Sequence, residues 1–192
     1  SSGAVSGSVV LRVVTFDIAS GATKQYAYLM ENASLTGCSE IAAITNTTFL
    51  TLERDGDYGG NPTKPATFKR VFKIDLAGAT DISDPSNGTN GKLFGGLTVE
   101  QLKDKTGLQN AGITPVTKTL VFDILAGFNP VYPHDKAEGI ALIGNNILAI
   151  SSDDDFGVVD NGKSGFTAKI LPATGKVDVN RIYFVTLPTP LR

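Results

Sequence analysis

Carboxylate side chains stand at the start and at the end of a predicted β-hairpin. Glu138 precedes a short apolar run at residues 140–143, and residues 153–155, all Asp, follow a second apolar run at residues 147–150. The Gly-Asn-Asn sequence between the runs is typical of a tight turn, so the pattern predicts two antiparallel strands. A hairpin places the start of its first strand beside the end of its second. The four carboxylates are therefore expected at one end of a sheet, where they repel each other unless a cation or basic groups compensate them.

The acidic hairpin has an earlier counterpart in the chain. Residues 40–59 align without a gap on residues 138–157, so that Glu40 falls on Glu138 and both copies end in Asp residues, an aromatic residue and Gly. Any two hairpins share apolar strands and a turn, which is the simpler explanation. An acidic exit followed by an aromatic residue and Gly is not required of a generic hairpin, however. A repeated sheet unit indicates a propeller, a solenoid or an array.

Oxygen-rich sets of this kind favour calcium, which takes about 6–8 oxygen ligands, mostly from carboxylates and carbonyls. Successive residues of a strand point to opposite faces, so at most two of the three consecutive Asp side chains aim the same way unless the chain turns there. Solvated turns are the alternative. Zinc is disfavoured because the chain has one Cys and one His. The predicted calcium ligands are Glu53, Asp55, Glu138, Asp153, Asp154 and Asp155.

Basic side chains near these carboxylates are candidates for catalysis. His134 lies four residues before Glu138 and could act as a general acid or base near neutral pH. Arg54, Lys136 or Lys69 is expected to hold the free oxygens of a phosphate ester. The alternatives are a surface His without a catalytic role and an ion pair of Arg54 that joins adjacent sheets. The chain has no G-x-S-x-G nucleophile motif and no glycine-rich phosphate loop.

Short strands must position these residues, and we predict a single all-β domain over residues 1–192. Residues 77–116 are predicted to be an insertion with one short helix near 99–106, because Thr98-Val-Glu-Gln101 forms a capping box and Gly107 marks a helix end. Besides the two hairpins, the predicted strands cover residues 9–18, 24–30, 68–76, 119–125, 166–171 and 181–187.

The strand order along the chain is two, then four, then three. This order predicts a piece of a β-propeller, with two to three four-stranded antiparallel blades. A closed propeller needs about 4–8 blades, so we expect a second chain or a missing segment to complete the ring. A β-sandwich is the alternative architecture.

The bulk composition excludes some classes of partner. The formal net charge is −2 and the pI is near 5.4, which disfavours nucleic acid as a partner. No apolar run approaches the roughly 20 residues that a helix needs to cross a bilayer, so no membrane contact is expected.

Four blocks of the sequence resemble, in order, the phytase-like domain family called "esterase-like activity of phytase". The blocks are F-L-T-L-E-R-D-G at 49–56, K-R-V-F-K-I-D-L-A-G-A-T at 69–80, A-E-G-I-A-L at 137–142 and I-L-A-I-S-S-D-D-D-F-G at 147–157. The resemblance covers most of residues 11–187. It implies a propeller fold, of which this chain would be the C-terminal part, and an exported protein, secreted or periplasmic and processed to its mature form. The residues that match the family's signature are Glu53, Arg54, Asp55, Gly56, Glu138, Gly139, Asp153, Asp154, Asp155 and Phe156.

Two functions follow as hypotheses. The first is a calcium-dependent hydrolase that acts on a small phosphate or carboxylate ester, as the resemblance implies. The second is a non-catalytic propeller module that binds a protein, a glycan or a small ligand and uses calcium only for stability, because a propeller fold alone does not fix a function.

Overall fold

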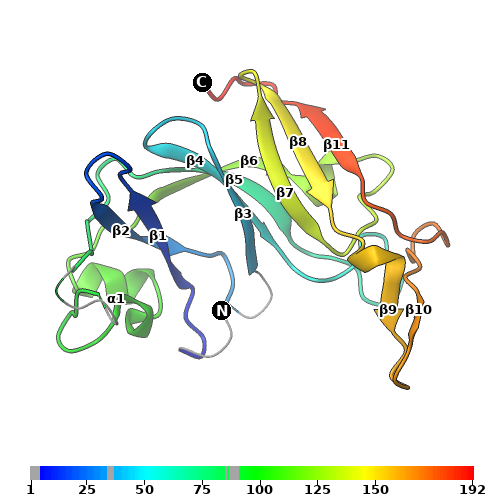
Figure 1. Ribbon diagram of the computed structural model, residues 1–192, viewed down its shortest axis with the longest axis horizontal. Coiled ribbons are helices and arrows are strands. Elements are labelled where there is room, and N and C mark those ends of the chain that lie inside the picture. The colour runs from blue at the N-terminus through cyan, green and yellow to red at the C-terminus, as the bar shows by residue number, and fades with distance from the viewer. Residues whose placement is uncertain (1–4, 34–36, 85, 87–90) are drawn as a thin grey trace. The chain divides into compact units, whose positions relative to one another are not determined.

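The computed structural model describes residues 5–33, 37–84, 86 and 91–192, and its secondary structure is almost entirely β (Figure 1). The described residues form eleven strands and two short α-helices. The strands pair in small sheets of two, four, three and two strands, so the prediction of an all-β fold is confirmed. No helix among these residues is long and apolar enough to cross a membrane. The contacts divide the chain into two compact units, residues 1–34 with 74–118 and residues 35–73 with 119–192.

The first unit combines the N-terminal hairpin with the segment predicted to be an insertion. Strands β1 (Val10–Phe16) and β2 (Thr23–Leu29) pair in antiparallel register. Residues 77–116 supply most of the apolar core beneath them, although residues 85 and 87–90 of that segment lie outside the described part. The buried core residues are Val10, Ala27, Ile82, Val99, Leu108 and Ile113. The segment is therefore a structural partner of the first hairpin.

The predicted helix near residues 99–106 is wrong in its bounds, because two shorter elements replace it. A 3₁₀ turn covers Val99–Leu102, and α1 covers Lys105–Asn110. The capping box forms as expected, with Gln101 Oε1 accepting from the Thr98 N–H at 2.8 Å. Gly107 lies inside α1 and not at its end. A Cβ at this position would lie 1.9 Å from the Leu102 carbonyl oxygen. The small size of Gly107 permits that approach.

The second unit is built around two sheets. The first has the order β3-β4-β5-β6 and the second the order β11-β8-β7, so the predicted strand order of two, four and three is confirmed. A separate ribbon pairs β9 with β10. The bounds are β3 Gly37–Ala43, β4 Thr48–Arg54, β5 Lys69–Asp75, β6 Thr117–Asp123, β7 Ala137–Ile143, β8 Ile147–Ser152, β9 Val158–Asp160, β10 Phe166–Ala168 and β11 Ile182–Thr186.

Alternating apolar residues hold these two sheets together. Strand β7 lies against β3 and β4, and Leu50, Leu52, Leu148 and Ile150 are fully buried in the shared core. Full burial of each such side chain contributes about 1.5–3 kcal/mol to stability. This packing brings the end of β4 close to the start of β7, where the predicted site residues lie.

The structure confirms the predicted repeat for the second strand of each hairpin but not for the first. Leu52 of β4 and Ile150 of β8 correspond as aligned, but Leu52 pairs with Glu40 whereas Ile150 pairs with Ile140. The gapless alignment is therefore wrong by two residues for the first strands, because the turn after β3 is longer. Glu40 does not correspond to Glu138 and instead accepts the N–H of Ile41 at 2.8 Å.

A second short helix, α2 (Ile124–Gly127), lies outside the segment in which one helix was predicted. It ends β6 two residues before the expected boundary at residue 125. The cause is local, since Asp123 Oδ1 accepts the N–H groups of Leu125 and Ala126 at 3.1 and 3.2 Å and caps the turn.

Candidate functional site

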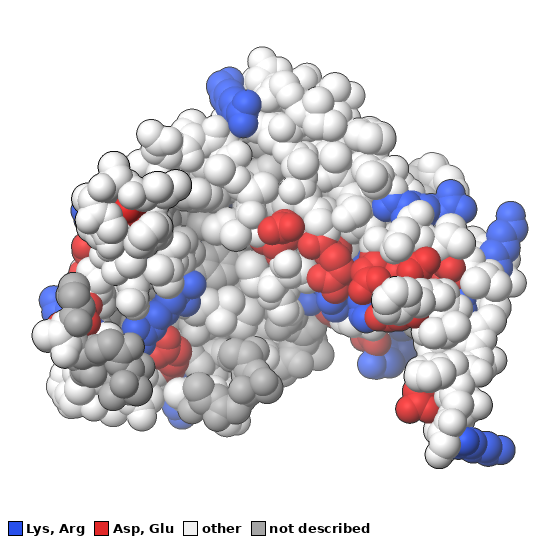
Figure 2. All heavy atoms as spheres, viewed as in Figure 1, with Lys and Arg blue, Asp and Glu red and all other residues white. Residues whose placement is uncertain are grey.

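Charged side chains gather in the second unit where β7 begins and β8 ends, and Figure 2 shows the acidic ones as a band on its surface. Glu138, Asp153 and Asp155 expose 33%, 47% and 36% of their side chains there. Most of the other charged side chains in this cluster are buried. Whether they can bind a metal or an anion therefore depends on the groups with which they already pair.

The buried pair Asp55 and Lys69 forms one part of the cluster. Lys69 Nζ lies 3.0 Å from Asp55 Oδ1 and also donates to the Asp135 carbonyl oxygen. Asp55 Oδ2 accepts the N–H groups of Thr67 and Phe68 at 2.7 and 2.9 Å. Burial works to raise the pKa of Asp55, but these backbone bonds and the Lys69 charge hold it below its usual value. The carboxylate oxygens of Asp55 are thus already occupied.

Lys169 forms the centre of the cluster, and no sequence pattern predicted it. Its ammonium lies 2.8 Å from Asp135 Oδ1, 2.9 Å from Asp155 Oδ2 and 3.4 Å from Asp178 Oδ2, and its side chain is only 1% exposed. Burial alone would lower the pKa of Lys169, but the bonds to Asp135 and Asp155 raise it above its usual value. The buried ammonium of Lys169 therefore compensates three carboxylates that would otherwise need a bound cation.

The predicted anion-binding residues are also paired. Arg54 forms an ion pair with Glu138, and its Nε donates to Ser39 Oγ at 3.0 Å. Lys136 forms an ion pair with Asp155. The hydrogen bonds from Lys136 and Lys169 lower the pKa of Asp155, which keeps this partly exposed carboxylate charged.

The structure thus brings most of the predicted residues into one region but does not arrange them as a calcium site. Asp154 exchanges hydrogen bonds with Asn180 at 2.9 and 3.0 Å, Asp153 accepts the Asp155 N–H at 3.0 Å, and Glu53 is buried in β4. Among the residues that the structure describes, no group of three or more His, Cys, Asp or Glu side chains is placed to hold a metal. Calcium stays a prediction that these contacts do not support.

His134 is completely buried, with both ring nitrogens engaged. Nδ1 lies 2.6 Å from Asp178 Oδ1, and Nε2 lies 2.7 Å from the Tyr183 hydroxyl. Burial lowers the pKa of His134 more than the Asp178 carboxylate raises it, so the ring is neutral near pH 7. In the tautomer that satisfies both contacts, Nδ1–H donates to Asp178 and Nε2 accepts from Tyr183. Asp178 and Tyr183 lie 44 and 49 positions away from His134, so sequence spacing gave no signal for them.

This buried imidazole predicts a step in the pH dependence of stability. The folded pKa of His134 lies below its ordinary value of 6.5, so the unfolded chain takes up the proton first as the pH falls. The free energy of unfolding should decrease by up to about 1.4 kcal/mol per pH unit below pH 6.5, until the folded pKa is reached. Asp55 and Asp155 have lowered pKa values and therefore lose their contribution only at more acidic pH.

Thermal melts followed by circular dichroism between about pH 7 and pH 5 test this step. His134→Gln, which cannot titrate, should lack it. Equal slopes for both proteins over this range would contradict the expectation.

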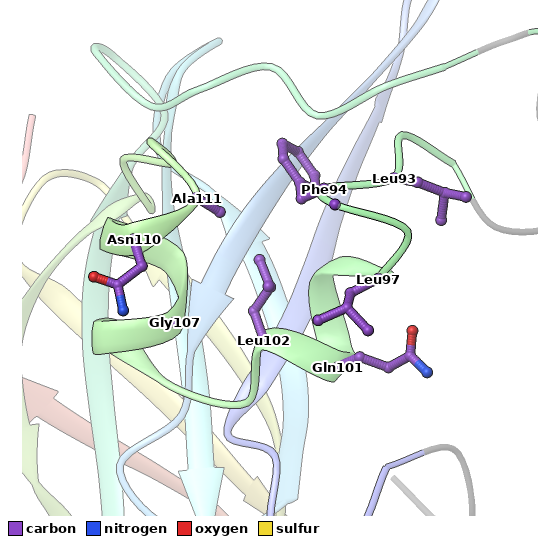
Figure 3. A pocket seen from close by; sticks show the side chains of 9 residues that line it. Leu93, Phe94, Leu97, Gln101, Leu102, Gly107, Asn110 and Ala111 are labelled. Carbon is purple, nitrogen blue, oxygen red and sulfur yellow. The ribbon is translucent and has the colours of Figure 1, made fainter.

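The first unit contains a separate cavity of about 670 Å³ (Figure 3). The side chains of Phe94 and Leu102 border it together with α1, and the described residues that line it include no titratable side chain. None of the predicted site residues lies there, and its lining offers no group for acid–base chemistry.

Comparison with family models gives a match over most of the chain. The family model "Phytase-like: Esterase-like activity of phytase" matches residues 1–156. No curated protein and no solved structure matches the chain. The matched part contains Arg54, Asp55, His134 and Lys136, whereas Lys169, Asp178 and Tyr183 follow it.

Proposed function

We propose that this chain, which belongs to the phytase-like family described as "Esterase-like activity of phytase", hydrolyses ester bonds. The observation that carries the proposal is the imidazole of His134, which Asp178 orients through a 2.6 Å hydrogen bond. A carboxylate that fixes the tautomer of a neutral His provides the acid–base device of many hydrolases. Its lowered pKa leaves the imidazole free to accept a proton at neutral pH.

The pairing of the basic residues favours an uncharged ester as substrate over a phosphate ester. A phosphate group at Arg54 or Lys136 would have to displace Glu138 or Asp155. The band of acidic side chains in Figure 2 would also repel an anion. A small carboxylic ester avoids both costs, whereas phosphate hydrolysis would need a cation to compensate this surface.

A non-catalytic binding module with structural calcium is the second candidate. The partly exposed carboxylates of Glu138, Asp153 and Asp155 favour it, since they outnumber the two partly exposed cations beside them, Arg54 and Lys136. Calcium bound to these carboxylates would stabilise the fold, and the chain would not hydrolyse esters.

We also propose that further sheet material completes the propeller, from a second chain or from a segment beyond this sequence. Strand β11 lies at the edge of its three-stranded sheet within the described residues, and Ile182 and Phe184 on it are each 63% exposed. Exposed apolar side chains on an edge strand favour a covering partner.

An assay with paired substrates separates the two candidate functions. We expect the chain to hydrolyse p-nitrophenyl butyrate with a higher kcat/KM than p-nitrophenyl phosphate, with the same rate in EDTA and in added calcium. Faster cleavage of the phosphate ester, or turnover only with calcium, would restore Arg54 and Lys136 as anion ligands beside a metal. A lack of turnover together with a melting temperature that falls in EDTA would favour the binding module.

A further inference from the structure

We propose that Tyr183 is the catalytic residue that contacts the substrate water, and that His134 acts through its hydroxyl group. This inference rests on the proposed ester hydrolysis. It comes from the hydrogen-bonded chain Asp178–His134–Tyr183, whose two links measure 2.6 and 2.7 Å.

Burial excludes His134 itself from direct contact with a substrate. The side chains of His134 and Asp178 are both 0% exposed, so neither nitrogen of the ring reaches solvent. One nitrogen faces Asp178 and the other faces Tyr183. A proton that enters or leaves His134 on the Nε2 side must therefore pass through the Tyr183 hydroxyl.

Within the described residues, Tyr183 is the only group between this buried ring nitrogen and the rest of the site in the hydrogen-bonded chain. It lies on the edge strand β11, where its half-buried side chain packs against the core on the face opposite the exposed Ile182 and Phe184. Its ring contacts Phe128 and Tyr132, with centroids 5.1 and 5.2 Å away, so its orientation is fixed by packing. Burial raises the pKa of Tyr183, which keeps the hydroxyl protonated and able to donate to His134.

One positive charge acts on both His134 and Tyr183. Arg181 precedes the strand, is exposed, and its charge acts to lower the pKa of both His134 and Tyr183. Within the described part of the chain, its guanidinium forms no ion pair. One unpaired cation suits the single oxyanion that forms when water attacks an ester carbonyl.

The proton transfers balance in two steps. As a water oxygen forms a bond to the ester carbonyl carbon, the water proton passes to Tyr183 Oη and the phenolic proton passes to His134 Nε2, giving an imidazolium that faces Asp178. When the tetrahedral intermediate collapses, the bond to the alcohol oxygen breaks. The same proton then returns through Tyr183 to that oxygen, which releases the alcohol and the acid and restores neutral His134.

The substitution Tyr183→Phe tests the relay, and Tyr132→Phe is its matched control. Both remove one hydroxyl group from the same aromatic cluster, but the Tyr132 hydroxyl donates to the Lys136 carbonyl oxygen at 2.9 Å and not to His134. With p-nitrophenyl butyrate, we expect Tyr183→Phe to lower kcat about 10²-fold or more with KM nearly unchanged, as loss of acid–base catalysis does. Tyr132→Phe should keep kcat within about threefold, and Arg181→Gln should lower it about tenfold.

Proton positions in the folded protein give a second readout that does not need turnover. In ¹⁵N NMR spectra, His134 Nε2 should be unprotonated in the wild type, and its signal should move in Tyr183→Phe but not in Tyr132→Phe. A proton on Nε2 at pH 7 would overturn the relay. Equal kcat for the two Phe variants would also overturn it, while the ester hydrolysis itself would stand. No hydrolysis by the wild type would overturn both the proposed function and the catalytic role of Tyr183.

Discussion

Replacing Lys169 by methionine should lower the free energy of unfolding by about 3–5 kcal/mol, the cost of leaving buried charges without their partner. The ammonium of Lys169 lies within 3.4 Å of carboxylate oxygens from three Asp residues, and its side chain is 1% exposed. Methionine fills a similar volume but leaves the buried carboxylates of Asp135 and Asp178 without this ammonium, while Asp155 keeps its ion pair with Lys136. Their repulsion and desolvation then oppose folding, and no water-exposed surface is available to relieve Asp178, which is fully buried.

Urea unfolding followed by circular dichroism measures this effect, because the chain has no Trp to report by fluorescence. Lys163→Met is the matched control, since Lys163 is exposed in the turn between β9 and β10 and should change stability by less than about 0.5 kcal/mol. A loss below about 1 kcal/mol at pH 7 would show that the three carboxylates do not depend on this ammonium.

Local signals in the sequence account for the parts of the fold that were predicted correctly. The second hairpin has an apolar alternation, a Gly-Asn-Asn turn and an acidic exit, all within about twenty residues, and each strand forms as expected. The strand order of two, four and three follows from such signals alone. The register of β3 was missed because a longer turn after Ala43 shifts that strand by two residues, and similar apolar residues at neighbouring positions hide the shift.

The charges that compensate the acidic site could not be predicted from the sequence next to it. The sequence revealed a cluster of acids, and their mutual repulsion led to the expectation of calcium. The structure instead supplies the compensating charges from outside the hairpin, from Lys69 at the start of β5 and from Lys169 just after β10. Each lies fourteen positions from a carboxylate that it contacts, Asp55 and Asp155 respectively. The sequence contains no periodic pattern that links a lysine after a short strand to three Asp residues. Pairing across the fold therefore decides between a metal site and an ion-pair cluster.

The substitution Asp178→Asn should reduce kcat for ester hydrolysis by about 10²–10⁴-fold, the range that general acid–base catalysis supplies. Asp178 Oδ1 now accepts from His134 Nδ1 at 2.6 Å and so fixes the proton on that nitrogen. An amide can instead donate to Nδ1, which moves the proton to Nε2, where it faces the Tyr183 hydroxyl. His134 can then no longer accept a proton from Tyr183, although the shape of the site is preserved.

Asp135→Asn provides the control that separates this loss from a loss of stability. Both substitutions remove one carboxylate from Lys169, at 2.8 Å for Asp135 and 3.4 Å for Asp178, but only Asp178 contacts His134. The two variants should therefore lose similar stability in urea, because Lys169 keeps two carboxylates in each, while kcat should fall only in Asp178→Asn. Equal kcat values for the two variants would remove His134 from the reaction and leave the Asp178 contact as a structural bond. The same comparison extended below pH 6.5 should show the acidic limb of the rate profile in Asp135→Asn and its displacement in Asp178→Asn, since Asp178 makes the hydrogen bond that stabilises the imidazolium.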